Sequence, residues 1–166
     1  MAFWGMSARS FAIDRRGLLI ASPALLALAG CNNAPRIYEL QASRDEGCMC
    51  CGEWVKTLEA TGRFKVTMFD QGDAPSFKRS AGVPEDMAGC HTAMVEKYVI
   101  EGHVPAADIL RLLDERPKGV LGLVVPGMPR GSPGMEQPNG AKDAYVVYAF
   151  EAGGVTREFA SYPGSA

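Results

Sequence analysis

Three cysteines stand within four residues of this chain, at Cys48, Cys50 and Cys51, and a fourth, Cys90, follows far along the sequence. Four cysteines in an oxidising compartment usually form two disulfides. A disulfide needs particular Cα and Cβ separations, however, and neighbouring cysteines are poorly placed to bridge each other. The spacing therefore favours a thiolate cluster that binds metal, with two structural disulfides as an alternative.

The same spacing bears on the choice of metal. Thiolates are soft ligands that favour Cu(I) and Zn(II). The adjacent Cys50 and Cys51 would crowd a single tetrahedral Zn(II), whose cysteine pairs are usually separated along the chain. Sulfurs that bridge several Cu(I) ions suit adjacent thiolates better. We therefore expect Cu(I) on Cys48, Cys50, Cys51 and Cys90, with a multinuclear thiolate cluster as one form that this site can take.

A second chemistry is open to the same residues. Cys48 and Cys51 form the pattern C-x-x-C, which is the redox motif of thioredoxin-like proteins. A helix that begins at this motif would lower the pKa of its cysteines and keep them deprotonated. The alternative function is therefore a thiol-disulfide oxidoreductase, and whether the protein is a copper or thiol oxidoreductase is left open.

The first thirty residues predict export. Arg15 and Arg16 precede an apolar stretch over 18–29 that Pro23 interrupts. This stretch is shorter than the ~20 apolar residues that a membrane-spanning helix needs, so residues 1–30 are interpreted as a signal peptide. Arg15-Arg16 also resembles a twin-arginine signal, although Asp14 departs from that pattern.

The stretch ends in Leu28-Ala29-Gly30-Cys31, which resembles the lipobox of bacterial lipoproteins. We expect Cys31 to carry lipid and residues 31–35 to form a tether, so that the protein is anchored to a membrane in the periplasm. The net charge of −2 becomes more negative without the basic leader, which argues against a nucleic-acid partner. The expected partners are copper ions and other periplasmic copper-handling proteins.

Hydrophobic periodicity predicts an α/β domain over residues 36–160. Expected strands cover 37–40, 64–69, 92–95, 98–101, 120–125, 145–150 and 155–159, and expected helices cover 52–60, 75–81 and 105–115. Residues 41–49 are expected to form a loop, and 126–142 a longer loop rich in glycine and proline.

This order of elements looks like thioredoxin. It implies a central mixed sheet flanked by helices, with an extra C-terminal β-hairpin. In that fold a cysteine-bearing turn begins the first long helix, and the loop before the hairpin faces it. We therefore expect Cys90 to lie next to Cys48, Cys50 and Cys51.

Four further side chains are candidates to bind the metal or to support its ligands from behind. His91 adjoins Cys90, and His103 lies in a turn before Pro105. Met128 and Met135 carry soft thioethers in the Gly/Pro loop, where burial in the core is a less natural explanation. For the histidines, the alternatives are an ordinary hairpin residue and a residue that shapes the turn.

Several stretches together resemble the CopG-type copper-resistance proteins, a family long catalogued as a domain of unknown function. They are Cys48–Trp54, Gly89–Ala93, Tyr98–Ala106, Val125–Pro129 and Gly131–Glu136. The resemblance implies a thioredoxin-like fold, a periplasmic role in copper resistance, and copper held by the four cysteines. The expected function is therefore to sequester Cu(I) or to change the redox state of copper.

Overall fold

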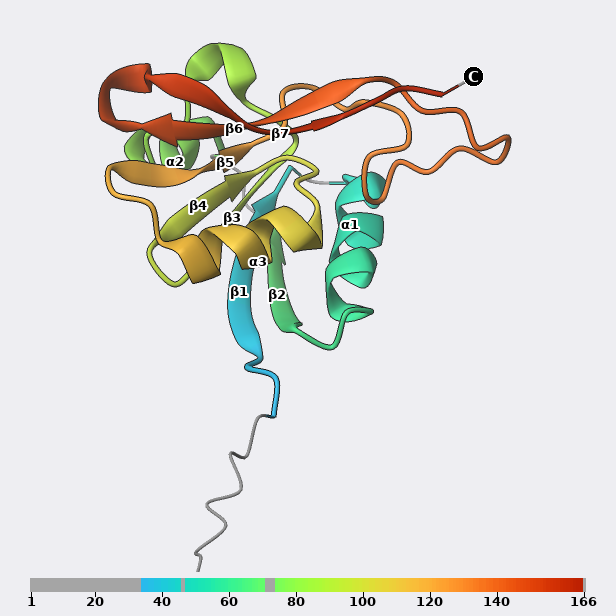
Figure 1. Ribbon diagram of the computed structural model, residues 1–166, viewed down its shortest axis with the longest axis horizontal. Coiled ribbons are helices and arrows are strands. Elements are labelled where there is room, and N and C mark those ends of the chain that lie inside the picture. Colours follow the sequence, from blue (N-terminus) through green and yellow to red (C-terminus); the bar gives the residue numbers. More distant parts are fainter. Residues whose placement is uncertain (1–33, 46, 71–73, 166) are drawn as a thin grey trace, which may run out of the picture. The chain divides into compact units, whose positions relative to one another are not determined.

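Seven strands form one mixed sheet in the part of the chain that the computed structural model describes, residues 34–45, 47–70 and 74–165. Their order across the sheet is β2-β1-β3-β4-β5-β6-β7 (Figure 1). The strands are β1 (Tyr38–Arg44), β2 (Phe64–Asp70), β3 (His91–Val95), β4 (Tyr98–Glu101), β5 (Val120–Val124), β6 (Tyr145–Glu151) and β7 (Thr156–Tyr162). The α-helices are α1 (Met49–Glu59), α2 (Ala74–Ser80) and α3 (Ala106–Glu115), with short 3₁₀ turns at Glu85–Met87 and Ala152–Gly154.

The sheet combines parallel and antiparallel pairs. β1 runs parallel to β2, and β4 runs parallel to β5. The pairs β1–β3, β3–β4, β5–β6 and β6–β7 are antiparallel. The expected α/β class, mixed sheet and C-terminal pair of strands are therefore confirmed.

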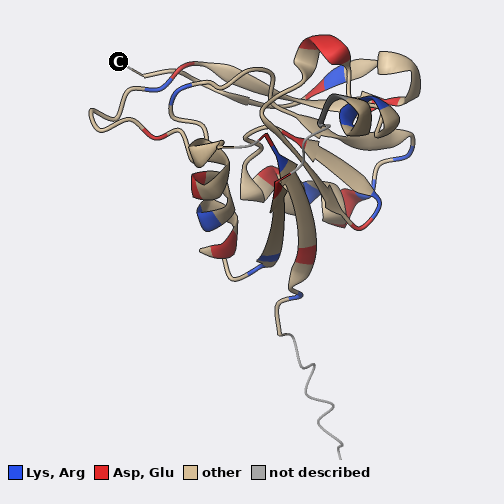
Figure 2. Ribbon diagram, turned by 180° about the vertical axis from the view of Figure 1, so that it is seen from behind, with Lys and Arg blue, Asp and Glu red and all other residues tan. Residues whose placement is uncertain are grey.

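Side chains alternate between two cores because successive residues of a strand point to opposite faces. In β4, Ile100 joins the larger core and Val99 joins the smaller one. The larger core also receives the buried faces of α1 and α3, including Trp54, Leu58 and Ile109. α2 lies on the opposite face of the sheet (Figures 1 and 2). With both faces covered, all four residues of β4 are buried.

Two predicted boundaries around the cysteines are wrong. The expected loop over 41–49 is too long, because β1 continues to Arg44 between two neighbouring strands. The helix expected from Gly52 begins at Met49. Its buried residues Cys51, Trp54 and Leu58 follow a spacing of three and four, which makes Cys51 part of the packed helix face. Cys50 and Cys51 therefore lie in the first turn of α1 and not in a preceding loop.

The long loop over 126–142 is confirmed, and it curls against the cysteine-bearing end of α1 (Figure 1). An ion pair between Arg130 and Asp143 closes its base, with Nη2 and Oδ1 2.6 Å apart. Asp143 also accepts a hydrogen bond from the backbone nitrogen of Arg130. Because the pair is exposed to solvent, it adds little to the free energy of unfolding. It mainly fixes the geometry of the loop.

Among the described residues, no helix is both long and apolar enough to cross a membrane. Basic and acidic residues are interspersed along the sheet and helices (Figure 2). The predicted signal peptide over residues 1–30 and the predicted lipidation site Cys31 lie outside the described residues.

Leu58 provides a test of how α1 is held to the sheet. Its side chain is fully buried, so Leu58→Ala should lower the free energy of unfolding by about 2–5 kcal/mol through lost burial and the cavity left behind. Ile37, which is 61% exposed, offers a control, and Ile37→Ala should change stability by less than about 0.5 kcal/mol. Urea denaturation of both variants measures the difference, and equal midpoints would contradict the packing described for α1.

Candidate metal centre

The four cysteines of the described residues gather where the first turn of α1 meets the loop before β3. Cys48 is the N-cap of α1, Cys50 and Cys51 lie in its first turn, and Cys90 immediately precedes β3. Their sulfur atoms lie within 4.8 Å of one another. Cys90 is therefore next to the other three thiols, as the order of elements predicts.

The individual sulfur distances place Cys90 beside both Cys50 and Cys51. The Cys90 Sγ lies 3.5 Å from the Cys51 Sγ and 3.9 Å from the Cys50 Sγ. The Cys50 Sγ lies 3.3 Å from the Cys48 Sγ. Cys51 is buried, whereas the other three are partly exposed, so the group opens to solvent on one side.

Cys48 and Cys51 are joined by a disulfide, while Cys50 and Cys90 are free. The expectation that these closely spaced cysteines would not bridge is wrong for this pair. One helical turn separates the two residues, and their Cα atoms lie 5.6 Å apart, within the usual range for a disulfide. The structure thus holds the C-x-x-C pair in its oxidised form, with a free thiol beside each of its sulfurs.

Backbone and side-chain contacts hold the two halves of the site together. The backbone nitrogen of Asp45, just after β1, donates to the carbonyl oxygen of Cys90 at 3.3 Å. Arg44 donates to the carbonyl oxygen of Cys48 at 3.1 Å and forms an ion pair with Asp70 at 2.7 Å. The end of β1 therefore positions both cysteine segments. The predicted loop over 41–49 did not include this part of the strand.

Both histidines of the chain lie against the cysteine group. The His91 Nδ1 and the His103 Nε2 each lie 3.5 Å from the Cys90 Sγ. Both side chains are fully buried, and their ring centroids lie 5.1 Å apart. The structure therefore places His91 and His103, which were separate candidates from sequence, against the cluster of Cys48, Cys50, Cys51 and Cys90.

Burial keeps the two imidazoles neutral. It lowers the pKa of His91 to about 3, with nearby His103 and Lys78 lowering it further. It also lowers the pKa of His103, against the opposing effect of a hydrogen bond to Pro133. Since neutral imidazole is the form that binds metal, both side chains are suited to act as ligands at neutral pH.

Burial dominates the pKa of Cys90. Burial, followed by the neighbouring Cys50, raises the pKa of Cys90 to about 12. Cys90 lies in the loop before β3 and not on α1, so loss of hydration dominates. The prediction of a lowered pKa concerned the cysteines at the start of the helix and does not apply to Cys90, so a metal ion must displace the proton of this thiol.

The Gly/Pro loop reaches the site through Pro133 and Gly134. The Pro133 carbonyl oxygen lies 2.8 Å from the His103 Nδ1. A β-carbon added at Gly134, whose φ is +82°, would overlap the backbone nitrogen of Trp54 in α1. Glycine therefore permits the close approach that lets the loop support His103.

The methionine candidates take different positions. Met128 is 55% exposed, and Met135 is partly buried next to Gly134. A ligand role for either remains a prediction. Met49, between Cys48 and Cys50, is 85% exposed and points away from the core.

A buried ion pair behind the site was missed by sequence analysis. The Lys78 Nζ in α2 lies 2.7 Å from the Glu101 Oε1 in β4 and donates to the Thr92 Oγ1 at 2.9 Å. Glu101 also accepts from the backbone nitrogen of Gly89 at 2.6 Å, one residue before Cys90. The only sequence signal was a glutamate closing an apolar strand, and the location of its lysine partner required the fold.

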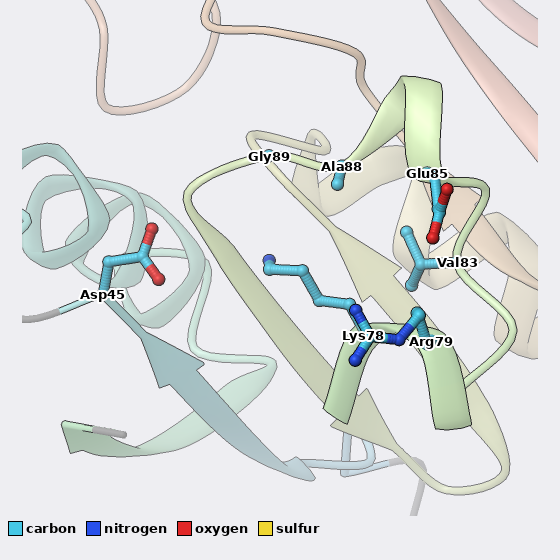
Figure 3. A pocket seen from close by; sticks show the side chains of 7 residues that line it. All are labelled: Asp45, Lys78, Arg79, Val83, Glu85, Ala88 and Gly89. Carbon is cyan, nitrogen blue, oxygen red and sulfur yellow. The ribbon is translucent and has the colours of Figure 1, made fainter. Parts of the chain in front are cut away.

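This network borders a pocket of about 380 Å³ between the end of β1, α2 and the loop before Cys90. Figure 3 shows the Lys78 side chain extending into it, between Asp45 and the Gly89 segment. Since Lys78 and Glu101 together tether Gly89, the wall of this pocket also helps to fix the position of Cys90.

Comparisons with known proteins show what this architecture is similar to. The fold and site define a mixed α/β protein whose cysteine cluster could hold a metal ion. Residues 87–135 match a family described as a protein of unknown function, DUF411. No curated protein matches the chain significantly.

Two solved structures show which family the chain belongs to. One, named copper resistance protein CopG, form 1, is 43% identical, with a TM-score of 0.71, and the match covers 79% of this chain and 100% of that one. Form 2 is 42% identical, with the same TM-score, over 77% of this chain and 100% of that one. The chain belongs to the CopG family of copper resistance proteins.

The ion pair behind Cys90 gives a stability test. Lys78→Met leaves the fully buried Glu101 without its countercharge and should lower the free energy of unfolding by about 3–5 kcal/mol. The double variant Lys78→Met/Glu101→Gln keeps an acceptor for Gly89 but removes the unpaired charge. It should therefore be more stable than Lys78→Met alone. Denaturant titration measures both, and a single variant as stable as the parent would contradict this assignment.

Proposed function

We propose that this protein binds Cu(I) through Cys48, Cys50, Cys51 and Cys90 and thereby limits copper toxicity, by sequestering the ion or changing its redox state. The observation that carries the proposal is the gathering of four cysteine sulfurs within 4.8 Å. Two relatives named copper resistance proteins support it. The chemistry follows from the softness of thiolate ligands, which suits Cu(I).

The sulfur distances by themselves fit more than one metal. Two sulfurs on a tetrahedral ion with metal–sulfur bonds of about 2.3 Å lie about 3.8 Å apart. The observed separations of 3.3 to 3.9 Å are close to that value. The choice of copper therefore rests on the soft donor set and the relatives, and the adjacent Cys50 and Cys51 favour sulfurs that bridge several Cu(I) ions.

The disulfide limits when copper can bind. The Cys48 and Cys51 sulfurs are bonded to each other, so neither is a thiolate in this state. Reduction of the pair by an external dithiol would supply two more thiolates beside Cys50 and Cys90. We therefore infer that the reduced protein is the form that holds the full Cu(I) complement.

The disulfide also favours one alternative, a thiol-disulfide oxidoreductase. A C-x-x-C pair at the N-terminus of a helix is the arrangement used for dithiol exchange. In support, Cys48 is the N-cap of α1 and Cys51 lies in its first turn. This activity requires Cys48 and Cys51, whereas copper binding by the cluster also requires Cys50 and Cys90.

We also infer a thioredoxin-like arrangement for residues 38–115. The support is the strand order β2-β1-β3-β4, in which β1 is parallel to β2 and antiparallel to β3. Helix α1 connects β1 to β2, and α3 follows β4. β5, β6 and β7 extend this sheet beyond β4.

For location, we propose export and attachment to a membrane in the periplasm through a lipid on Cys31. The supporting features are the short apolar segment after Arg15 and Arg16 and the sequence Leu28-Ala29-Gly30-Cys31. In that compartment, the partners would be copper ions and other copper-handling proteins.

Cys90→Ala tests the four-cysteine site. Because bridging sulfurs act as a unit, the copper-to-protein ratio of the reduced variant should fall to less than about half of the parental value, nearly as far as in Cys50→Ala. Elemental analysis after anaerobic Cu(I) loading and gel filtration gives the ratio. Circular dichroism should show an unchanged fold.

Two results of this experiment separate the candidate functions. Cys90→Ala should still exchange its Cys48–Cys51 disulfide with a small dithiol, which Cys48→Ala cannot do. A folded Cys90→Ala protein with the parental copper ratio would rule out the four-cysteine site. Dithiol turnover in that protein would then favour the oxidoreductase.

Cys31→Ser tests the anchor. The variant should move from the membrane fraction to the soluble exported fraction, because the thiol that accepts lipid is gone. It should keep the parental copper ratio, which makes it the matched control for Cys90→Ala. Identical fractionation of Cys31→Ser and the parent would count against lipidation.

A further inference from the structure

We propose that one end of the sheet is a docking surface for the anionic phospholipids of the membrane to which the protein is attached. This basic end consists of four segments, residues 34–37, 60–63, 96–97 and 116–119. The inference rests on the proposed lipid attachment for the presence of a membrane, and on the described residues for the surface itself.

Strand pairing brings the four segments of the basic end together. The first two segments precede β1 and β2, whose parallel register aligns Tyr38 with Phe64. The third segment is the turn between β3 and β4, and the antiparallel register of β1 and β3 aligns Leu40 with Val95, just before this turn. The fourth segment leads into β5, which runs parallel to β4 and therefore begins at the same end of the sheet.

Contacts between side chains join three of these segments to Arg36. The Arg63 Nε donates to the Arg36 carbonyl oxygen at 2.9 Å. The Arg36 Nη2 lies 2.7 Å from the Glu96 Oε1, and the Arg116 Nη2 lies 2.9 Å from the Glu96 Oε2. One carboxylate therefore faces two guanidinium groups, and positive charge remains in excess.

The same excess is found over the whole basic end. Its acidic residue is Glu96, and its basic residues are Arg36, Arg63, Lys97, Arg116 and Lys118. Most of these side chains are exposed, and that of Arg36 is 62% exposed. Asp114 and Glu115, in the last turn of α3, reduce the excess without reversing it. The chain as a whole has a net charge of −2, so this end is positive on an acidic protein.

The covalent chain limits how far the basic end can lie from the proposed anchor. Arg36 follows Cys31 by five residues, and an extended chain spans at most about 3.6 Å per residue, so the two lie within about 18 Å of each other. Basic residues are attracted to anionic lipids within a Debye length, about 8 Å at physiological ionic strength. A short tether keeps the basic end near this range, and a weak attraction suffices because the anchor raises the local concentration.

Docking at this end points the cysteine cluster away from the membrane. β1 has seven residues, and at about 3.3 Å per residue its two ends lie about 20 Å apart. The cysteine segments are bound to Arg44 and Asp45, at the far end of β1 from the basic end (Figure 1). The turns near the cysteines carry Asp45, Glu85 and Asp86, which an anionic surface repels. The copper site therefore faces the aqueous side, where soluble partners can reach it.

The test uses the Cys31→Ser protein, which carries no lipid, with vesicles of phosphatidylglycerol or of phosphatidylcholine. The protein should sediment with phosphatidylglycerol vesicles at about 10 mM salt, where the Debye length is about 30 Å, and much less with phosphatidylcholine vesicles. Binding to phosphatidylglycerol should weaken as the salt concentration is raised to about 0.15 M.

Two double variants in the Cys31→Ser background separate the basic end from net charge. Lys97→Gln/Lys118→Gln removes two charges from the basic end and keeps the contacts of its arginines. It should weaken binding to phosphatidylglycerol vesicles by at least about tenfold, because each exposed basic residue near the lipid adds to the attraction. Lys56→Gln/Arg79→Gln makes the same change of charge on α1 and α2, and should weaken binding by less than about twofold. Circular dichroism checks that both variants are folded.

The lipidated parent, reconstituted into the same two kinds of vesicle, reports the orientation. Compared with phosphatidylcholine, phosphatidylglycerol should slow amide hydrogen exchange at 96–97 and 116–119. Exchange at 85–89, beside the cysteine cluster, should not change. Protection at 85–89 with none at 96–97 and 116–119 would contradict the proposed orientation.

Equal weakening of binding by the two double variants would overturn the docking surface, as would failure of the folded Cys31→Ser protein to bind phosphatidylglycerol vesicles at low salt. The proposed attachment fails by a different measurement, the fractionation of Cys31→Ser against the parent. If that attachment is wrong, the parent itself carries no lipid, and the vesicle assay on the parent still decides whether the basic end binds anionic phospholipid.

Discussion

The packing of Trp54 in the middle of α1 is the contact on which the rest of the site depends. The side chain is fully buried, its Nε1 donates to the Val104 carbonyl oxygen at 2.9 Å, and its ring lies against His91. Its backbone nitrogen is covered by Gly134 of the Gly/Pro loop. One residue therefore joins α1, β3, the turn after β4 and the loop over 126–142, and these segments carry the cysteines and histidines.

The surroundings of Cys90 show how a fixed framework determines the chemistry of one thiol. Its carbonyl oxygen is tied to Asp45, and the preceding Gly89 is tied to the buried Glu101. These contacts hold the sulfur between the other cysteines and the two histidines. Because the thiol is partly buried and faces Cys50, its pKa is raised, and binding of a metal ion must supply the energy to remove the proton.

Much of the fold follows from local pattern. Short apolar and β-rich runs predicted the strands, and the face formed by Ile109, Leu112 and Leu113 predicted α3. The errors fell at the cysteines, where Gln41 and Ser43 suggested a loop. There, burial between two neighbouring strands extended β1, and packing of Cys51 against the core extended α1 toward its N-terminus. Tertiary contacts outweighed local composition at both positions.

The sequence by itself determined the donors: four soft thiols, two imidazoles, and a Gly/Pro loop long enough to fold back on the helix. It also determined that adjacent Cys50 and Cys51 are poorly placed to pair with each other, because a disulfide usually needs a wider Cα separation. Only the tertiary structure decided that Cys90 and His103 meet, since sheet pairing brings distant segments together. It likewise decided that Lys78 neutralises Glu101, because a buried charge needs a partner and these two residues, 23 positions apart, meet only when α2 packs on the sheet.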